Sequence, residues 1–314
     1  MKISIQTQPM VDYFGIRDAY RMIREAGFEA VDWGLDRAWR TSAVIAAKEF
    51  RDLCIFEKDL DTCLAHYAEE LDAMRENGLV ITQVHAPCPA YHVDAQPGMT
   101  DYAIGILSNV IRFCQAVGCP RVVIHAVSST ARDYITREEV DRLNHYLFES
   151  LIPALQETDV VVCIENLPIF ATNLNNKDSY PGSFCKPQGI VEFIDALNEK
   201  AGKECFGICL DSGHLHLTAI RPYKFIEGIG KRLRAFHLHD NMKKFDAHLM
   251  PYMGSVRWAE FLTSLRKIGY DGDINFETCG QIGAHFLPKE LIPVFLETTA
   301  DIGRYFRSQI QAKD

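Results

Sequence analysis

The chain lacks the features that mark membrane, secreted or disulfide-stabilised proteins. No apolar run approaches the ~18 residues that a membrane span needs, and Met1-Lys2 leads directly into an apolar alternation without a signal peptide. The ten cysteines form no C-x-x-C pair. Several, such as Cys163 and Cys209, lie in apolar runs, which is typical of reduced core thiols. We therefore expect a cytoplasmic protein without membrane contact.

Positive charge is also scarce. The 314 residues carry a formal net charge of −9, and no block of Lys or Arg occurs. A protein whose main partner is nucleic acid usually presents a basic face. The sequence thus disfavours nucleic acid and favours a small-molecule substrate, and it is compatible with a homo-oligomer. At 47% hydrophobic residues, the composition is ordinary for a globular protein with a sizeable core.

Eight short apolar runs alternate with segments of helical periodicity along the whole chain. The runs predict strands at residues 3–5, 30–34, 79–84, 122–124, 160–164, 206–210, 233–236 and 274–276. The intervening segments predict helices at 16–26, 60–77, 102–117, 137–157 (with a kink at Pro153), 188–198, 223–229, 258–268 and 287–306.

This alternation predicts a parallel sheet with right-handed crossovers. Eight units without a linker between them predict one domain over residues 1–314, an α/β fold of the (β/α)8 TIM-barrel type. An open doubly wound sheet is the alternative, and the first strand-to-helix turn lacks its G-x-G-x-x-G loop. Segments 35–59 and 168–186 read as long loops that cover the barrel mouth.

The ends of the third to eighth predicted strands all carry metal-ligand residue types. Functional residues of such barrels lie at the carboxyl ends of the strands, and buried carboxylates are rare unless paired or bound to a cation. A single histidine here could equally be a hydrogen-bonded core residue. The six together are expected to converge on the barrel axis: His85, His125, Glu165, Asp211, His237 and Glu277.

Four of these residues, Glu165, Asp211, His237 and Glu277, form a carboxylate-rich set that suits Mn²⁺, Mg²⁺, Co²⁺ or Zn²⁺. The segment 206–248 reinforces this prediction, because it holds five of the eleven histidines. Those histidines and the aspartates among them are His214, His216, His237, His239, His248, Asp211, Asp240 and Asp246. Imidazole and carboxylate groups together favour a divalent metal ion of the zinc or manganese kind.

Several local motifs occur in a characteristic order. They are Val-His-Ala-Pro at 84–87, Ile-Glu-Asn at 164–166, Leu-Asp-Ser-Gly-His at 210–214, His-Leu-His-Asp-Asn at 237–241, Asp-Ala-His-Leu at 246–249 and Phe-Glu-Thr at 276–278. With these motifs the chain resembles, from end to end, the xylose-isomerase-like barrel superfamily. That superfamily holds sugar isomerases and epimerases, inosose dehydratases and the endonuclease IV repair enzymes.

The resemblance implies that Glu165, Asp211, His237 and Glu277 bind the principal metal, and that Glu165 and Glu277 also move the protons. It implies that His214 contacts either substrate or a further metal. Asp246 and His248 match the Asp-x-His of the trinuclear endonuclease site, and His85 and His125 match its two early histidines. All nine ligand types of that site are therefore present.

The remaining assignments concern the substrate. His239 is expected to contact substrate or to support the ligands, Lys243 to replace the substrate arginine of the ketose epimerases, and Trp33 to line the substrate site. Two positions depart from the family pattern. Tyr252 replaces a loop glycine, and Ala171 replaces a substrate-binding glutamate of the ketose epimerases.

The leading hypothesis is a metal-dependent isomerase or epimerase of a sugar, sugar phosphate or polyol, with proton transfer through an enediolate by Glu165 and Glu277. An endonuclease IV-like phosphodiesterase and an inosose-type dehydratase are alternatives. A non-catalytic sugar-binding barrel is a third, and it would have no need of both glutamates. The sequence leaves the sugar, the metal and the oligomeric state open.

Overall fold

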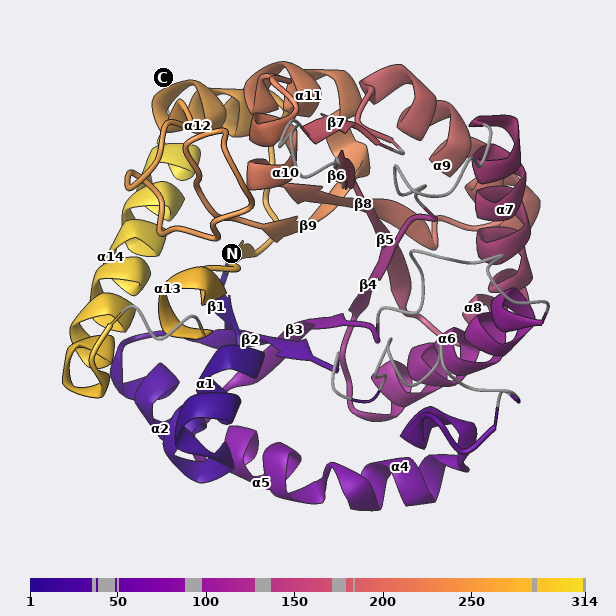
Figure 1. The fold of residues 1–314 in the computed structure, drawn as a ribbon, viewed down its shortest axis with the longest axis horizontal. Coiled ribbons are helices and arrows are strands. Elements are labelled where there is room, and N and C mark those ends of the chain that lie inside the picture. The colour runs from indigo at the N-terminus through magenta and orange to yellow at the C-terminus, as the bar shows by residue number, and fades with distance from the viewer. Residues whose placement is uncertain are drawn as a thin grey trace.

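Eight parallel strands form one sheet in the computed structural model, with the order β10-β1-β2-β3-β4-β5-β8-β9. The structure describes residues 1–35, 38, 49, 51–87, 98–127, 137–170, 179–182, 184–283 and 287–312. The two outer strands meet through Leu238, whose N–H donates to the Asn275 carbonyl and whose carbonyl accepts from the Glu277 N–H. The sheet is thus a nearly closed barrel inside a ring of helices (Figure 1), which confirms the predicted (β/α)8 fold.

The eight barrel strands match the predicted runs to within one residue at each end. Parallel strands are buried on both faces, so each reads as a continuous apolar run that is easy to recognise. Their bounds are β1 (Ile3–Gln6), β2 (Ala30–Gly34), β3 (Val80–His85), β4 (Arg121–His125), β5 (Val161–Glu165), β8 (Phe206–Asp211), β9 (Leu233–His237) and β10 (Ile274–Phe276). A short antiparallel hairpin, β6 (Pro168–Phe170) with β7 (Ser179–Pro181), was not predicted.

The helices differ from the predicted ones in two ways: two predicted helices are divided, and α1, α10 and α13 were not predicted. The predicted helix 60–77 is two helices that meet at Tyr67, and 137–157 is two that meet at Leu151, because Pro153 cannot continue an unbroken helix. The α-helices are α1 (Gln8–Phe14), α2 (Ile16–Glu25), α4 (Leu60–His66), α5 (Ala68–Glu76), α6 (Met99–Ala116), α7 (Arg137–Ser150), α8 (Ile152–Gln156), α9 (Pro187–Ala201), α10 (Ser212–Leu217), α11 (Pro222–Ile229), α12 (Trp258–Lys267), α13 (Cys279–Gly283) and α14 (Ile292–Gln311).

The two loops predicted at 35–59 and 168–186 are only partly within the described residues. The predicted loop at 35–59 contains a short 3-10 helix, η2 (Ile55–Glu57); two more are η3 (Gly230–Arg232) and η4 (Lys289–Leu291). Most of segment 36–50 and all of 171–178 lie outside the described residues, so the predicted cover of the barrel mouth stays a prediction. Among the described helices, none combines the length and apolar character needed to cross a membrane.

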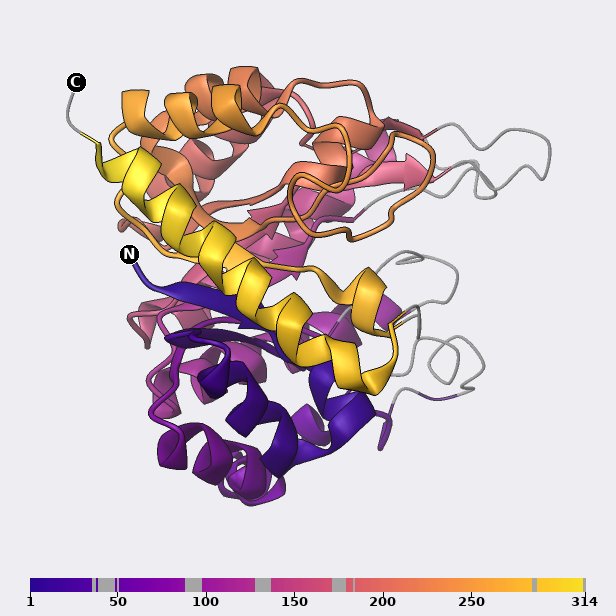
Figure 2. The ribbon, with the colours of Figure 1, turned by 90° about the vertical axis from the view of Figure 1, so that its left-hand side faces the viewer.

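The last helix, α14, crosses the outside of β1 and β10 and holds the first and last strands together (Figure 2). Gly303 makes this close approach possible. A methyl group at that position would lie 2.5 Å from Cγ2 of Ile3 and 2.9 Å from Cε2 of Phe276, both of which are fully buried. Because the closure of the barrel fixes the strand ends, this helix contributes indirectly to the arrangement of the site.

We expect Gly303→Ala to lower the free energy of unfolding by about 1–3 kcal/mol, because the added methyl overpacks the core. Gly105→Ala is the matched control. Gly105 lies on the exposed side of α6 with open space around it, so alanine there should raise stability by about 0.5–1 kcal/mol. Urea unfolding of the two variants tests both signs, and equal stability of the two would contradict this packing of α14.

Candidate metal centre

The six predicted strand-end residues lie at the carboxyl end of the barrel, and the strand register places two couples of them directly opposite each other. His125 pairs with Glu165 across β4 and β5, and Asp211 pairs with His237 across β8 and β9. His85 ends β3, and Glu277 follows β10 directly. Five of the six are buried, and His125 is partly buried. At two other steps the register is offset by two residues, because His85 pairs with Val123 and Glu165 with Cys209. An offset of two keeps the side chains on the same face, so all of them point into the barrel at the carboxyl ends of the strands.

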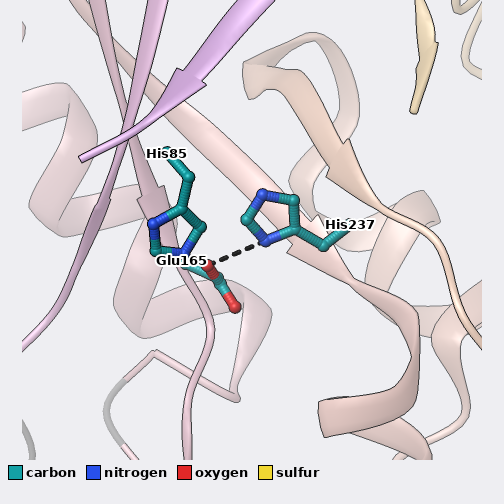
Figure 3. A group of neighbouring side chains, drawn as sticks. All are labelled: His85, Glu165 and His237. Carbon is teal, nitrogen blue, oxygen red and sulfur yellow. Dashed lines mark ion pairs between the residues drawn. The ribbon is translucent and has the colours of Figure 1, made fainter. Parts of the chain in front are cut away.

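His237 lies at the centre of an inner group of ligands. Its Nδ1 is 3.0 Å from Oε2 of Glu165 and 3.6 Å from Oε2 of Glu277. The same Glu165 oxygen is 3.2 Å from Nε2 of His125. His85 stacks on the His237 ring with centroids 5.2 Å apart and planes 12° from parallel. Figure 3 shows Glu165 beside the two histidines, with its ion pair to His237 drawn as a dashed line.

A second group adjoins the first through Glu165 and Asp211. Nδ1 of His214 is 3.1 Å from Oε1 of Glu165, and its Nε2 is 3.3 Å from Oδ2 of Asp246. Nε2 of His248 lies 2.9 Å from the same Asp246 oxygen. Asp211 begins α10 by accepting the His214 N–H at 2.6 Å. This N-cap explains the three-residue spacing of the two side chains, because it turns His214 back toward the barrel axis.

Several buried polar atoms of these two groups have no hydrogen-bond partner among the described residues. They include Oε2 of Glu165, both ring nitrogens of His237, Nδ1 of His239 and Oδ1 of Asp246. A buried polar atom without a partner costs about 1–3 kcal/mol. Clusters of such atoms therefore fit a bound cation that would satisfy them.

Within the part of the chain that the structure describes, four sets of side chains have ligand atoms close enough together to share an ion. They are His85 with Glu165 and His237; Asp211 with His237 and Glu277; Asp211 with His214 and His239; and His239 with Asp246 and His248. Mixed imidazole and carboxylate donors suit Zn²⁺, Mn²⁺ or Co²⁺, and the carboxylates also suit Mg²⁺.

Charge in the cluster is arranged to keep the carboxylates ionised. Burial acts to raise the pKa of Glu165, but His237 and His125 outweigh it and hold that pKa well below its usual value. Asp246 has its pKa held well below the usual value by His214 and His248, again against burial. Ionised carboxylates are the form that binds a metal, so a divalent ion would compete with the imidazolium partners and release protons.

Asp240 shapes the loop that carries Asp246 and His248. Its Oδ1 accepts the Val256 N–H at 3.0 Å, and its Oδ2 accepts the Trp258 indole N–H at 2.8 Å and the Tyr252 N–H at 3.1 Å. A fully buried carboxylate with this many donors is saturated, so Asp240 ties the far end of the loop to the end of β9. It is a structural residue beside the ligands.

The two remaining histidines of the 206–248 segment differ in position: His239 lies in the cluster, and His216 lies outside it. His239 joins the cluster: its Nε2 is 3.0 Å from Asp211, and its ring stacks on His248 with centroids 4.0 Å apart. A Cβ at Gly213 would lie 1.9 Å from the His239 ring, so this position makes room for the imidazole. His216 contacts Oγ of Ser255 at 2.8 Å and belongs to none of the candidate ligand sets found among the described residues, so its role here is packing.

The predicted substrate residues Lys243 and Trp33 lie outside the cluster. Lys243 is exposed in the loop, with a positive φ of 62°. Trp33 is a correction: its indole N–H donates to Glu70 at 2.8 Å and its ring packs on Tyr67, toward the helices. Alternation along β2 explains this, because Trp33 points outward and its neighbour Asp32 points inward. Ala171 lies outside the described residues.

Sequence reasoning missed two side chains that touch the cluster from below. Gln6 donates to Oε1 of Glu277 at 2.9 Å, and Asp32 lies 3.2 Å from Nε2 of His237. The available signal was a polar residue inside or at the end of an apolar strand. Both strands are short, and their polar residues precede the third strand, where the search for strand-end ligands began.

The family model described as "Xylose isomerase-like TIM barrel" matches residues 20–294, and the chain belongs to this family. The uncharacterised protein y4fM of Sinorhizobium fredii is 26% identical over 84% of this chain and 81% of its own length. The probable endonuclease 4 of Mycoplasma pneumoniae is 23% identical over 76% of this chain and 74% of its own length.

Solved structures share the fold over nearly the whole chain. D-psicose 3-epimerase with D-tagatose from Clostridium cellulolyticum has a TM-score of 0.67 at 14% identity, covering 98% of this chain and 99% of that chain. The IolI protein with a binding zinc atom also has a TM-score of 0.67, at 13% identity, covering 99% of this chain and 98% of that chain.

We expect the chelator-treated protein to be stabilised by Mn²⁺ or Zn²⁺, by about 2.7 kcal/mol when the ion is present at about 100 times its dissociation constant. His237→Ala should lose most of this gain, because the inner group is built around that ring. His145→Ala, on the exposed side of α7, is the control and should keep it. Thermal unfolding with and without metal measures the effect; the absence of a shift with either ion would contradict the assignment of a metal centre.

Proposed function

We propose that the protein is a metal-dependent isomerase or epimerase of a carbohydrate. One observation carries the proposal: two buried glutamates, Glu165 and Glu277, lie within 3.0 Å and 3.6 Å of the same nitrogen of His237. They come from β5 and from the end of β10, which are separated in the barrel by β8 and β9. Two carboxylates that approach one imidazole from different strands suit a reaction that removes a proton and returns it elsewhere.

The inner group would hold the ion through Glu165, Asp211, His237 and Glu277. When bound, a divalent ion supplies Lewis-acid polarisation of a substrate carbonyl and its neighbouring hydroxyl. One glutamate then removes the proton from the adjacent carbon, and the other delivers a proton to the opposite face or to the next carbon. The burial of both carboxylates excludes water from these transfers.

Second contacts orient each glutamate. Gln6 holds Oε1 of Glu277 at 2.9 Å, and Nδ1 of His214 lies 3.1 Å from Oε1 of Glu165. In each carboxylate Oε1 is thus held by a neighbouring side chain, and Oε2 is the oxygen that points toward His237. His214 and His239 are proposed to line the substrate side, with Lys243 at the loop. The shared fold of D-psicose 3-epimerase and the family match support a sugar as the substrate class.

Glu165→Gln and Glu277→Gln should fold and should each slow proton exchange at the reacting carbon by about 10²–10⁴-fold, because each removes one acid–base group. The measurement is deuterium uptake from D₂O into ketose sugars, followed by NMR. Glu157→Gln, at an exposed ion pair with Arg112, is the control and should exchange as the wild type does. Undiminished deuterium uptake in both active-site variants would refute the mechanism.

A phosphodiesterase of the endonuclease kind is the second candidate. The observation that favours it is the second group, because Asp246, His248 and His214 lie together beside the inner ligands as a further metal would require. The similarity to probable endonuclease 4 agrees with it. The net charge of −9 opposes it, because binding to DNA draws much of its strength from neutralised phosphates. A dehydratase would use the residues of the first proposal and differ in product alone.

Counting metals separates the two candidates. For the sugar enzyme we expect one or two ions per chain by elemental analysis and no incision of duplex DNA that contains an abasic site. For the phosphodiesterase we expect three ions and incision that Asp246→Ala abolishes. The same duplex without the abasic site is the control substrate. Three ions together with specific incision would replace the first proposal by the second.

A further inference from the structure

Asp32 is a buried carboxylate inside the barrel, one layer below the strand ends. It is fully buried on β2, and its Oδ2 accepts hydrogen bonds from Nε2 of Gln83 at 3.0 Å and from Nδ2 of Asn275 at 2.8 Å. Its Oδ1 has no hydrogen-bond partner among the described residues. Such a group is expensive to bury unless an opposite charge or a cation lies nearby.

The surrounding network is built to keep this carboxylate in place. The amide groups of Gln83 and Asn275 also donate to the carbonyl of Phe236, at 3.1 Å and 3.0 Å. Ser4 donates its hydroxyl to Oδ1 of Asn275 at 2.9 Å, which turns the NH₂ group of that amide toward Asp32. The carboxylate is therefore held on its β3 and β10 sides by neutral donors, and none of these three residues supplies a positive charge.

Among the described residues, the basic side chain in ion-pair contact with Asp32 is His237, whose Nε2 lies 3.2 Å from Oδ2. The other nitrogen, Nδ1, faces Glu165 and Glu277 in the inner group. Both ring nitrogens thus face carboxylates, and a metal ion held by Nδ1 would require that nitrogen to be without its proton. The single proton of the neutral imidazole would then lie on Nε2, where Asp32 is placed to accept it.

We propose that Asp32 is a positioning residue: it fixes the Nε2–H tautomer and the ring orientation of His237, so that Nδ1 is presented to the metal. The inference rests on the proposed metal-dependent function and deepens it, because it assigns a role to a residue that does not itself touch the ion or the substrate. Carboxylate partners of ligating histidines generally change metal affinity by about 10–100-fold.

A purely structural role for Asp32 makes a different prediction from a positioning role. In the double variant Asp32→Asn, Asn275→Asp, the network keeps one carboxylate and one amide in contact, and Ser4 keeps an acceptor. The negative charge, however, moves to residue 275, which contacts Asp32, Phe236 and Ser4 but not His237 among the described residues. A structural role should be restored by this exchange, whereas a positioning role should not.

The test is a titration of chelator-treated protein with Mn²⁺, in which the EPR signal of the free ion gives the bound equivalents and their affinities. In Asp32→Asn we expect one equivalent to bind about 10–100-fold more weakly than in the wild type, and the exchanged double variant to be equally weak. Thr299→Val, a buried hydroxyl in α14 remote from the barrel interior, is the control and should bind as the wild type does. Circular dichroism establishes that each variant is folded.

A measurement on the wild type decides the matter if the variants do not fold. Long-range ¹H–¹⁵N NMR of the zinc-loaded protein should show His237 protonated at Nε2 and bound through Nδ1. Wild-type Mn²⁺ affinity in folded Asp32→Asn, its restoration in the double variant, or a zinc bound through Nε2 would overturn the inference. A wild type that binds neither Mn²⁺ nor Zn²⁺ would instead refute the proposed function on which the inference rests.

Discussion

Negative charge gathered at one end of the barrel is the constraint on which the rest of the structure depends. Five carboxylates occupy this largely buried space: Asp32, Glu165, Asp211, Asp246 and Glu277. Each has at least one imidazole within 3.6 Å. Carboxylates at such density repel one another, so the fold is stable only if cations intervene. The histidines can serve as those cations, and a divalent ion would serve better because it also satisfies the unpartnered oxygens.

The architecture of the barrel follows from local patterns that a sequence displays. Each buried strand is a continuous apolar run, and the parallel arrangement brings the last residues of the runs to the same end of the barrel. The eight strands and the meeting of His85, His125, Glu165, Asp211, His237 and Glu277 could therefore be predicted. The points at which helices break were harder to predict. Pro153 indicated a break in the helix predicted at 137–157, whereas no residue indicated the break at Tyr67.

The sequence does not show which of two neighbouring residues on a strand points toward the barrel axis, because successive side chains alternate between the two faces. Trp33 and Asp32 are neighbours, and only one of them can point to the barrel axis. Trp33 was expected to line the substrate site, but the aspartate points inward and the indole fills the space toward α5. The hairpin of β6 and β7 escaped notice because three-residue strands leave too short a pattern to recognise.

The two ligand groups differ in what holds them. Glu165, His237 and Glu277 are attached to the ends of barrel strands, whereas Asp246 and His248 are attached to a loop that Asp240 fastens to β9 and α12. Stiffness should therefore decrease from the inner group to the outer one. It follows that the loop can lengthen, shorten or exchange residues without moving the side chains of the inner group. A barrel of this kind can in this way gain or lose its outer group over evolutionary time while the inner group persists.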